Sequence, residues 1–339
     1  MKSLWIFRSN IRDLEYYHQY RFLQEFKEKC HDFYLLQGIF YLESDFVDEV
    51  IVWRLQPKKR VKDLVFNIHG KKFIQKFVDD FSECLKFPKP FITLWRGGFP
   101  EYDNLTKKHY KFFGSRSLYL GAGKRLFPQY GGMYDVILLE DERDFNKSFK
   151  CFPFYKTANS NIFRAVSLPK KYDICWVCNF SQIRYKGQEF FISAISKSKF
   201  LKSLRIVHAG NKPEVGKKLC KKYNVDNIEF KGWLDRIALS TTLNGSKIGI
   251  VTSNQVDGCP RVSTEILMTG TPLLVRDETR LLCYYKKNGA IEFSDQNISK
   301  KIKMVFSNYN DYYVKLQASI ESTFSLESIC RMNWKLWSK

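Results

Sequence analysis

The sequence has no apolar run that approaches the roughly eighteen residues needed for a membrane-spanning helix. Its first residues, MKSLWIFRSN, become charged after only a few apolar positions, so the apolar core of a signal peptide is not expected. The 9 cysteines are odd in number and widely spaced, which argues against a disulfide framework. These absences predict a protein of a reducing compartment, cytoplasmic, and either soluble or attached peripherally to a membrane.

Motifs for metals and for ATP are also missing. The 5 histidines are scattered, with no HExxH and no other ligand spacing. Cys175 and Cys178 form a CxxC, but they lie in a predicted buried strand with no second pair, so we interpret both as core residues. The segment 121–125, GAGKR, lacks P-loop spacing; it predicts a turn, with a phosphate cradle for the acceptor as the alternative. No metal site is expected.

Acidic residues are outnumbered, with 35 Asp and Glu against 56 Lys and Arg and a formal net charge of +21. A hydrophobic share of 44% and an aromatic share of 16% exclude a disordered basic chain. A folded basic surface attracts nucleic acid, anionic lipid or phosphorylated small molecules, and charge alone does not choose among them. Lys217, Lys218, Lys221 and Lys222 recur at helical spacing, typical of a solvated face or of a contact with anionic lipid.

The pattern of apolar residues indicates two α/β domains, and 339 residues suffice for two cores. Predicted strands cover 3–7, 49–55, 63–69, 90–95, 117–121, 134–140, 172–180, 203–210, 227–233, 247–253 and 271–276. Predicted helices cover 16–29, 71–85, 188–198, 214–223 and 261–269. An irregular stretch at 151–171 predicts the linker. We therefore expect two doubly wound parallel sheets, over residues 1–165 and 166–325.

The segment 248–272 is the richest in possible chemistry. A predicted strand ends at Thr252–Ser253, a loop with Asp257, Gly258 and Pro260 follows, and a helix begins near residue 261. Glycine lets a ligand approach the backbone, and the start of a helix attracts an anion. Glu265, one turn into that helix, could accept hydrogen bonds from the hydroxyls of a ribose. The alternative is a surface loop with an exposed glutamate.

A second loop holds Arg184, Lys186 and Gly187 between a predicted strand and a helix. Because the carboxyl ends of parallel strands gather at one edge, both loops are expected to line a common crevice. Cationic side chains there would neutralise a departing diphosphate. The alternative is a solvated basic loop.

Five short motifs follow one another in a recognisable order. They are Lys186-Gly187, Gly210, Phe230-Lys231-Gly232, the run from Asp257-Gly258-Cys259-Pro260 to Glu265, and Gly270-Thr271-Pro272. This order resembles the nucleotide-sugar-binding domain of family 4 glycosyltransferases, which have the GT-B fold. The resemblance implies two Rossmann-like domains facing a central cleft. It also implies transfer of a sugar, with retention and without an obligatory metal, from a nucleotide-diphosphate-sugar to a glycan or lipid-linked acceptor.

The resemblance assigns roles to the residues of these motifs. It places the ribose on Glu265, the diphosphate on Lys186, and the donor sugar on Asp257 with the backbone of Gly258, Cys259 and Pro260. Gly187 is a further candidate donor-binding residue. Asp257 is one methylene shorter than the family's usual glutamate, which could alter the choice of sugar. The family's arginine falls on Phe180 or Ser181, so Arg184 is the candidate to replace it.

The amino-terminal half would be the acceptor domain, with the last helix, at about 326–339, packing back on it. His69 and Arg96 end predicted strands and are the candidates for the reaction centre, together with Asp257. A lipid-linked acceptor would give the basic surface an anionic membrane as partner. Two alternatives remain: a glycosyltransferase acting on nucleic acid, and a non-catalytic binding protein on the same scaffold.

Overall fold

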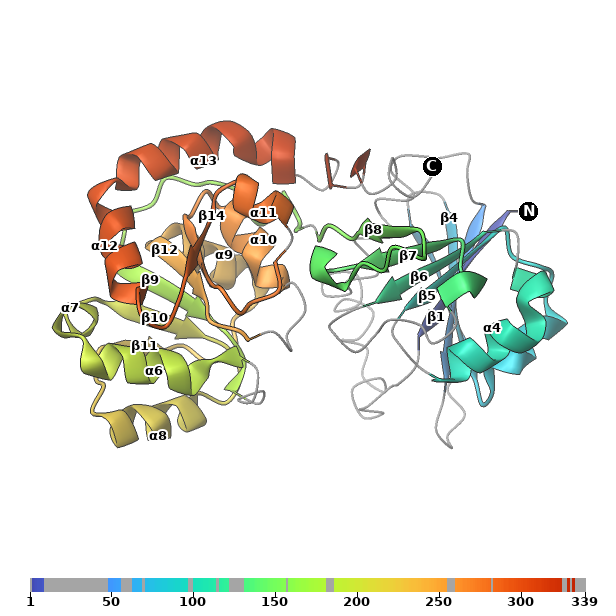
Figure 1. Ribbon diagram of the computed structural model, residues 1–339, viewed down its shortest axis with the longest axis horizontal. Helices are drawn as coiled ribbons and strands as arrows, with labels where there is room; N and C mark the ends of the chain where they lie inside the picture. The colour runs from blue at the N-terminus through green and yellow to red at the C-terminus, as the bar shows by residue number, and fades with distance from the viewer. Residues whose placement is uncertain are drawn as a thin grey trace. The chain divides into compact units, whose positions relative to one another are not determined.

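The chain divides into two units, which we describe separately. The first comprises 1–154 with 330–339, and the second is Tyr155–Ile329. The structure, a computed structural model (Figure 1), describes residues 2–8, 48–55, 63–68, 71–96, 100–113, 116–121, 131–156, 158–180, 186–254, 260–281, 283–324, 328–329 and 331–332. The helix predicted from the sequence at 16–29 therefore lies wholly outside the described residues, and the one at 326–339 lies largely outside them.

The division falls earlier than the boundary expected at 165. Ala158 and Phe163 are buried in the core of the second unit, with Tyr155 packed against it. The main-chain carbonyl of Lys156 accepts a hydrogen bond of 2.8 Å from the hydroxyl of Tyr285. The start of the expected linker is instead the last strand of the first sheet, β8 (Cys151–Pro153).

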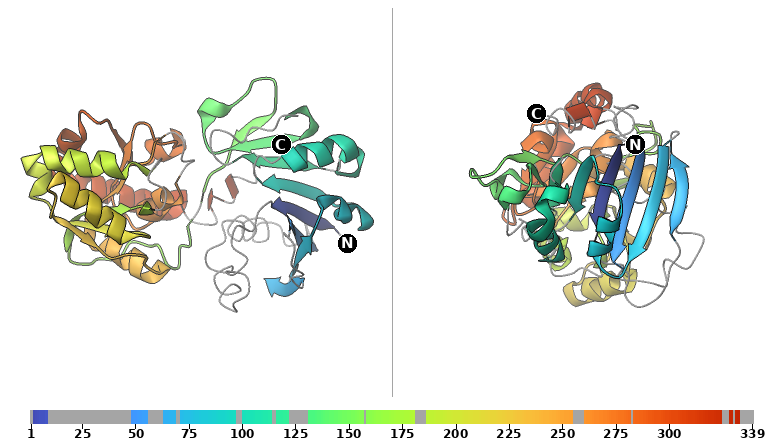
Figure 2. Two further views of the ribbon diagram at one scale, coloured as in Figure 1. Left: turned by 90° about the horizontal axis from the view of Figure 1, so that it is seen from below. Right: turned by 90° about the vertical axis from the view of Figure 1, so that its right-hand side faces the viewer.

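The first unit is built on an eight-stranded sheet in the order β3-β4-β2-β1-β5-β6-β7-β8. Its further strands are β1 (Ser3–Arg8), β2 (Glu49–Leu55), β3 (Leu64–Ile68), β4 (Lys71–Val78), β5 (Ile92–Arg96), β6 (Ser117–Gly121) and β7 (Val136–Leu139). All neighbouring pairs are parallel except β3 and β4. The right-hand view of Figure 2 shows the blue strands near the N-terminus side by side.

The helix predicted over 71–85 is wrong. Residues 71–78 form β4, which pairs in parallel with β2 and antiparallel with β3. A short 3-10 helix, η1 (Phe81–Lys86), follows, and Asp80 and Glu83 close a capping box at its start. The spacing of apolar residues in this segment is only a weak local preference for a helix, and pairing with two neighbouring strands outweighs it.

Aromatic rings fill one side of the first sheet. Trp5 and Phe7 of β1 point to this side, whereas Leu4 and Ile6 are buried on the other, as expected of a central parallel strand. The ring of Phe7 stacks on that of Trp95 with centroids 4.1 Å apart. Helix α4 (Pro100–Phe113), which had no predicted counterpart, contributes Tyr102, Leu105 and Phe113 to this core.

The second unit is a six-stranded parallel sheet in the order β11-β10-β9-β12-β13-β14. Its strands are β9 (Tyr172–Val177), β10 (Ile206–Ala209), β11 (Ile228–Phe230), β12 (Ser246–Val251), β13 (Leu273–Arg276) and β14 (Ala290–Phe293). The helices are α6 (Gln188–Lys197), α7 (Lys199–Lys202), α8 (Pro213–Tyr223), α9 (Arg236–Asn244), α10 (Arg261–Met268), α11 (Cys283–Lys287), α12 (Ile298–Ser307) and α13 (Tyr309–Phe324). This is the strand order of a doubly wound dinucleotide-binding fold.

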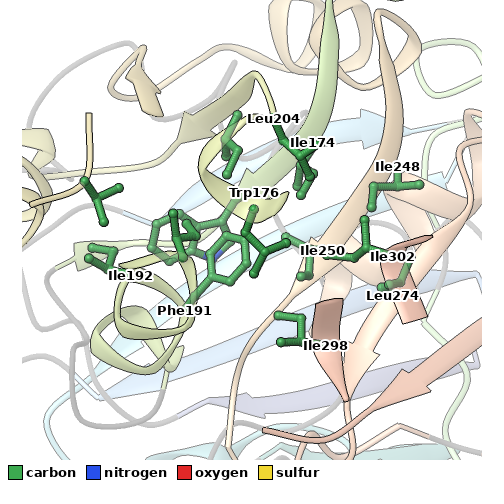
Figure 3. Packing of buried hydrophobic residues seen from close by; sticks show 14 of the residues in the cluster. Ile174, Trp176, Phe191, Ile192, Leu204, Ile248, Ile250, Leu274, Ile298 and Ile302 are labelled. Carbon is green, nitrogen blue, oxygen red and sulfur yellow. The ribbon is translucent and has the colours of Figure 1, made fainter. Parts of the chain in front are cut away.

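Both faces of the second sheet are buried. On one face, Ile174 and Trp176 of β9 pack with Ile250 of β12, Phe191 of α6 and Ile302 of α12 (Figure 3). The other face has its own cluster, in which α10 and α13 cover the sheet. No helix within the described ranges is both long and apolar enough to cross a membrane.

Candidate active site

The strand order of the second unit fixes where a ligand can approach its edge. Strands β9 and β12 are neighbours, and the helices that follow them, α6 and α10, pack on opposite faces of the sheet. Ligands of such sheets bind outside the carboxyl ends of the strands at this switch point. The Lys186-Gly187 pair follows β9, and Thr252 follows β12, and these described residues of the two loops are in contact there.

Gly187 is required by the backbone at this point. It precedes α6 with φ of 67°, in the left-handed region. A Cβ atom placed on it would lie 1.9 Å from the main-chain oxygen of Thr252. The turn that precedes α6 therefore packs directly on the end of β12. Lys186, in the same turn, is half-buried.

Thr252 bonds this turn to the core. Its hydroxyl donates a hydrogen bond of 2.8 Å to the carbonyl of Lys186 and accepts one of 3.1 Å from the indole N–H of Trp176. Thr252 and Trp176 are buried, so water does not compete for these bonds. Sequence reasoning took Thr252 only as the end of a strand and missed this role.

Two further glycines of the motif series lie at the same edge. The N–H of Gly210, after β10, donates a hydrogen bond of 2.8 Å to the carbonyl of Gly232, after β11. A Cβ on Gly210 would lie 1.7 Å from the carbonyl oxygen of Cys178. The Nε2 of His208 bonds to that same carbonyl at 2.9 Å, and burial lowers the pKa of His208 to about 4. At neutral pH this histidine is an uncharged support of the edge.

Glu265 occupies the first turns of α10 and is 5% exposed. Its Oε1 forms an ion pair with Nη1 of Arg236, the first residue of α9. Within the described residues, its Oε2 has no hydrogen bond. Glu265 is thus a buried, oriented carboxylate with one oxygen held by Arg236, a partner that the sequence motifs did not reveal.

The close packing of α10 on the sheet explains where Glu265 sits. A Cβ on Gly249 of β12 would lie 2.6 Å from the side chain of Ile266, so only glycine lets the helix approach this near. Pro260 caps the start of α10. Gly270, with φ of 68°, turns the chain from the end of the helix into β13.

Several predicted site residues lie outside the described part of the chain. They are His69, Arg184, Asp257, Gly258 and Cys259. Arg96 is the last residue of β5 and lies opposite Arg8 of β1 in the parallel register. Strands β1 and β5 are the switch point of the first sheet, so the backbone of Arg96 reaches the edge where a ligand of that unit would bind.

The described residues contain no group of three His, Cys, Asp or Glu side chains arranged to hold a metal ion. Cys175 is fully buried in β9, and burial raises the pKa of its thiol to about 12, as befits a core residue. The possible phosphate cradle beginning at Gly121 lies almost wholly outside the described residues.

Comparison with known proteins decides the family. Residues 161–320 match the family described as glycosyl transferases group 1. This region of the chain is a group 1 glycosyltransferase domain. The matched region lies within the second unit and contains every motif on which the sequence resemblance was based.

Solved structures confirm the GT-B fold that the sequence predicted. Sucrose-phosphate synthase from Thermosynechococcus elongatus is 11% identical, with a TM-score of 0.71, covering 100% of this chain and 98% of that chain. Anabaena HepE in complex with UDP and glucose is 9% identical, with a TM-score of 0.65 and 100% of both chains covered. A glycosyltransferase from Rickettsia africae ESF-5 is 13% identical, with a TM-score of 0.69, covering 99% of this chain and 98% of that chain. No curated protein matches the sequence.

Proposed function

We propose that this glycosyltransferase binds a nucleoside diphosphate sugar at the β9–β12 edge and passes the sugar, with retention, to a glycan or lipid-linked acceptor. The observation that carries the proposal is the junction of the Lys186-Gly187 turn with the end of β12, beside which α10 presents Glu265. In this proposal Oε2 of Glu265 accepts a hydrogen bond from the ribose. Lys186 and the first amides of α10 bind the diphosphate.

The remaining roles follow the family resemblance. Asp257, Gly258, Cys259 and Pro260 would hold the donor sugar, and Arg184 would add a second positive charge at the diphosphate. His69 and Arg96 would act near the acceptor. Because cationic groups would offset the charge of the leaving diphosphate, we expect no obligatory metal, and turnover that survives EDTA would support this.

A screen against a panel of nucleotide sugars tests the donor site, with UDP-glucose first because HepE has been solved with it. We expect one donor to raise the thermal midpoint of the protein and to be slowly hydrolysed. Glu265→Gln should strongly weaken both effects, whereas Glu189→Gln, at an exposed carboxylate of α6 in the same unit, should preserve them. A full response in Glu265→Gln would remove the ribose role, and no response of the native protein to any donor would contradict the proposal.

The acceptor is the second part of the proposal. We propose that the chain works in polysaccharide biosynthesis on the cytoplasmic face of a membrane, where lipid-linked glycans present their hydroxyls. Incubation with the identified donor and a set of lipid-linked saccharides should give a product whose new bond keeps the donor's anomeric configuration, as read by NMR. Transfer to an oligonucleotide instead would overturn this choice of acceptor.

A further inference from the structure

Six lysines of the second unit form what we call the α7–α12 face: Lys197, Lys199, Lys202, Lys300, Lys301 and Lys303. Five are exposed, and Lys301 is half-buried. Residues 190–213 and 296–310, which carry them, contain no aspartate or glutamate. Across the described ranges, none of the six makes an ion pair. Their charge is therefore not neutralised by the residues of the unit that the structure describes.

The two segments of this face touch. The hydroxyl of Ser198, between Lys197 and Lys199, lies 3.1 Å from the hydroxyl of Ser299, beside Lys300. The ammonium group of Lys303 lies 4.9 Å from the centre of the Phe200 ring. Figure 1 shows α7 and α12 on one flank of the unit. The six charges thus form one continuous patch.

This patch lies at the edge of the sheet opposite to the proposed donor site. The ring centres of Phe306, in α12, and Phe200 lie 6.4 Å apart. The ammonium group of Lys247 lies 5.3 Å from the centre of the Phe306 ring. Lys247 stands near the start of β12 and pairs at 2.9 Å with Asp173, near the start of β9. The donor loops follow the carboxyl ends of the same two strands. A ligand on the patch therefore leaves those loops uncovered.

We propose that the α7–α12 face binds the surface of an anionic lipid bilayer. All six residues are lysines, which act as point charges toward phosphate headgroups and strengthen binding by about fivefold each near such a surface. Base-stacking sites for nucleic acid need exposed aromatic rings, whereas Phe200 and Phe306 are half-buried and packed on each other. This inference does not depend on the identity of the donor.

The four lysines of α8 form a less suitable surface. Lys222 pairs with Glu189 at 2.8 Å, and that carboxylate also accepts a hydrogen bond from Tyr223. Glu214 opens the same helix. Anionic side chains therefore interrupt this second group of lysines, and three of them, Lys217, Lys218 and Lys221, offer a matched control.

Vesicle sedimentation of the full chain tests the proposal. One variant replaces Lys199, Lys202 and Lys303 with Ala, and the control variant replaces Lys217, Lys218 and Lys221. Each lowers the net charge of +21 by three. We expect the native protein to sediment with phosphatidylcholine–phosphatidylglycerol vesicles but not with pure phosphatidylcholine, and to be released by salt. The first variant should bind about 100-fold more weakly, and the control less than tenfold more weakly.

Several outcomes would overturn the proposal. Equal losses in the two variants would mean that total charge, and not this face, sets binding. The absence of any charge-dependent sedimentation of the native protein would also refute it. Loss of binding to a single-stranded oligonucleotide, with vesicle binding intact in the first variant, would assign the face to nucleic acid. Circular dichroism and thermal unfolding of both variants establish that they fold, and the response to the nucleotide-sugar panel separates a failed donor site from a failed membrane face.

Discussion

The hydroxyl of Thr252 donates a 2.8 Å hydrogen bond to the main-chain carbonyl of Lys186, and so joins the end of β12 to the turn that precedes α6. The indole of Trp176 donates to the same hydroxyl at 3.1 Å. The turn that carries the proposed diphosphate-binding lysine therefore cannot shift without breaking a bond to the core of the unit.

Replacement of Thr252 with Val keeps the shape of the side chain but removes both hydrogen bonds. The buried indole N–H of Trp176 then has no acceptor, and we expect a loss of about 1–3 kcal/mol in the free energy of unfolding. Because the Lys186 turn is released, the KM for the donor should rise about tenfold. Urea unfolding and initial rates measure the two effects. Thr252→Ser keeps the hydroxyl and should restore the KM; if it behaves like Val, the hydroxyl does not position the turn.

Gly187 allows a second test of the same turn. An alanine there would combine a left-handed backbone with a Cβ 1.9 Å from a main-chain oxygen. We expect Gly187→Ala to destabilise the protein by more than about 2 kcal/mol and to weaken donor binding. At Gly132 a new Cβ would meet its nearest atom at 3.7 Å, so Gly132→Ala is the matched control and should change the urea midpoint little. Similar midpoints for the two variants would contradict the tight contact at Gly187.

These glycines also show why so much of the second unit could be predicted. Gly187, Gly210, Gly232 and Gly270, all named in the sequence motifs, have positive φ in the structure. A positive φ is a local requirement that favours glycine, so it can be recognised at fixed positions in the sequence. Five of the six strands of this unit were predicted for the same reason, since buried parallel strands are continuous apolar runs.

Features that depend on distant partners were missed. The pairing of β4 with β2 and β3 converted a predicted helix into a strand. The short strand β14 and helices α9, α12 and α13 had no predicted counterpart, because their packing on the sheet decides their structure. The ion pair of Arg236 with Glu265 joins residues 29 positions apart on two different helices, and no spacing rule reveals it.

That ion pair leads to a prediction with two variants. Glu265→Gln keeps the side-chain shape but loses the charge, and we expect donor affinity to fall about 100-fold, the cost of a charge-assisted hydrogen bond. Arg236→Met leaves the buried carboxylate of Glu265 without its cation, so it should cost about 3 kcal/mol or more in stability besides weakening the donor. Calorimetric titration and urea unfolding separate the effects. If Arg236→Met leaves donor affinity unchanged, Arg236 supports only the fold.

His208 predicts how the protein responds to acid. Its ring is buried among Trp176, Phe180 and Phe230, its Nδ1 has no hydrogen-bond partner within the described ranges, and burial lowers its pKa to about 4. An unfolded chain takes up a proton at this histidine near pH 6.5, whereas the folded chain does so only near pH 4. Between these values acid favours the unfolded state, so this residue removes about 3 kcal/mol of stability as the pH falls through the window.

The acid dependence can be assigned to His208 by comparing variants that do not titrate. Both His208→Phe, which retains an aromatic ring, and His208→Gln, which retains a donor for the carbonyl of Cys178, should flatten the loss of stability between pH 6.5 and 4. Urea midpoints measured across this range give the slope for each protein, and offsets in absolute stability between the variants do not affect the comparison. A native slope that persists in both variants would show that other groups, and not His208, set the response, because neither replacement can bind the proton.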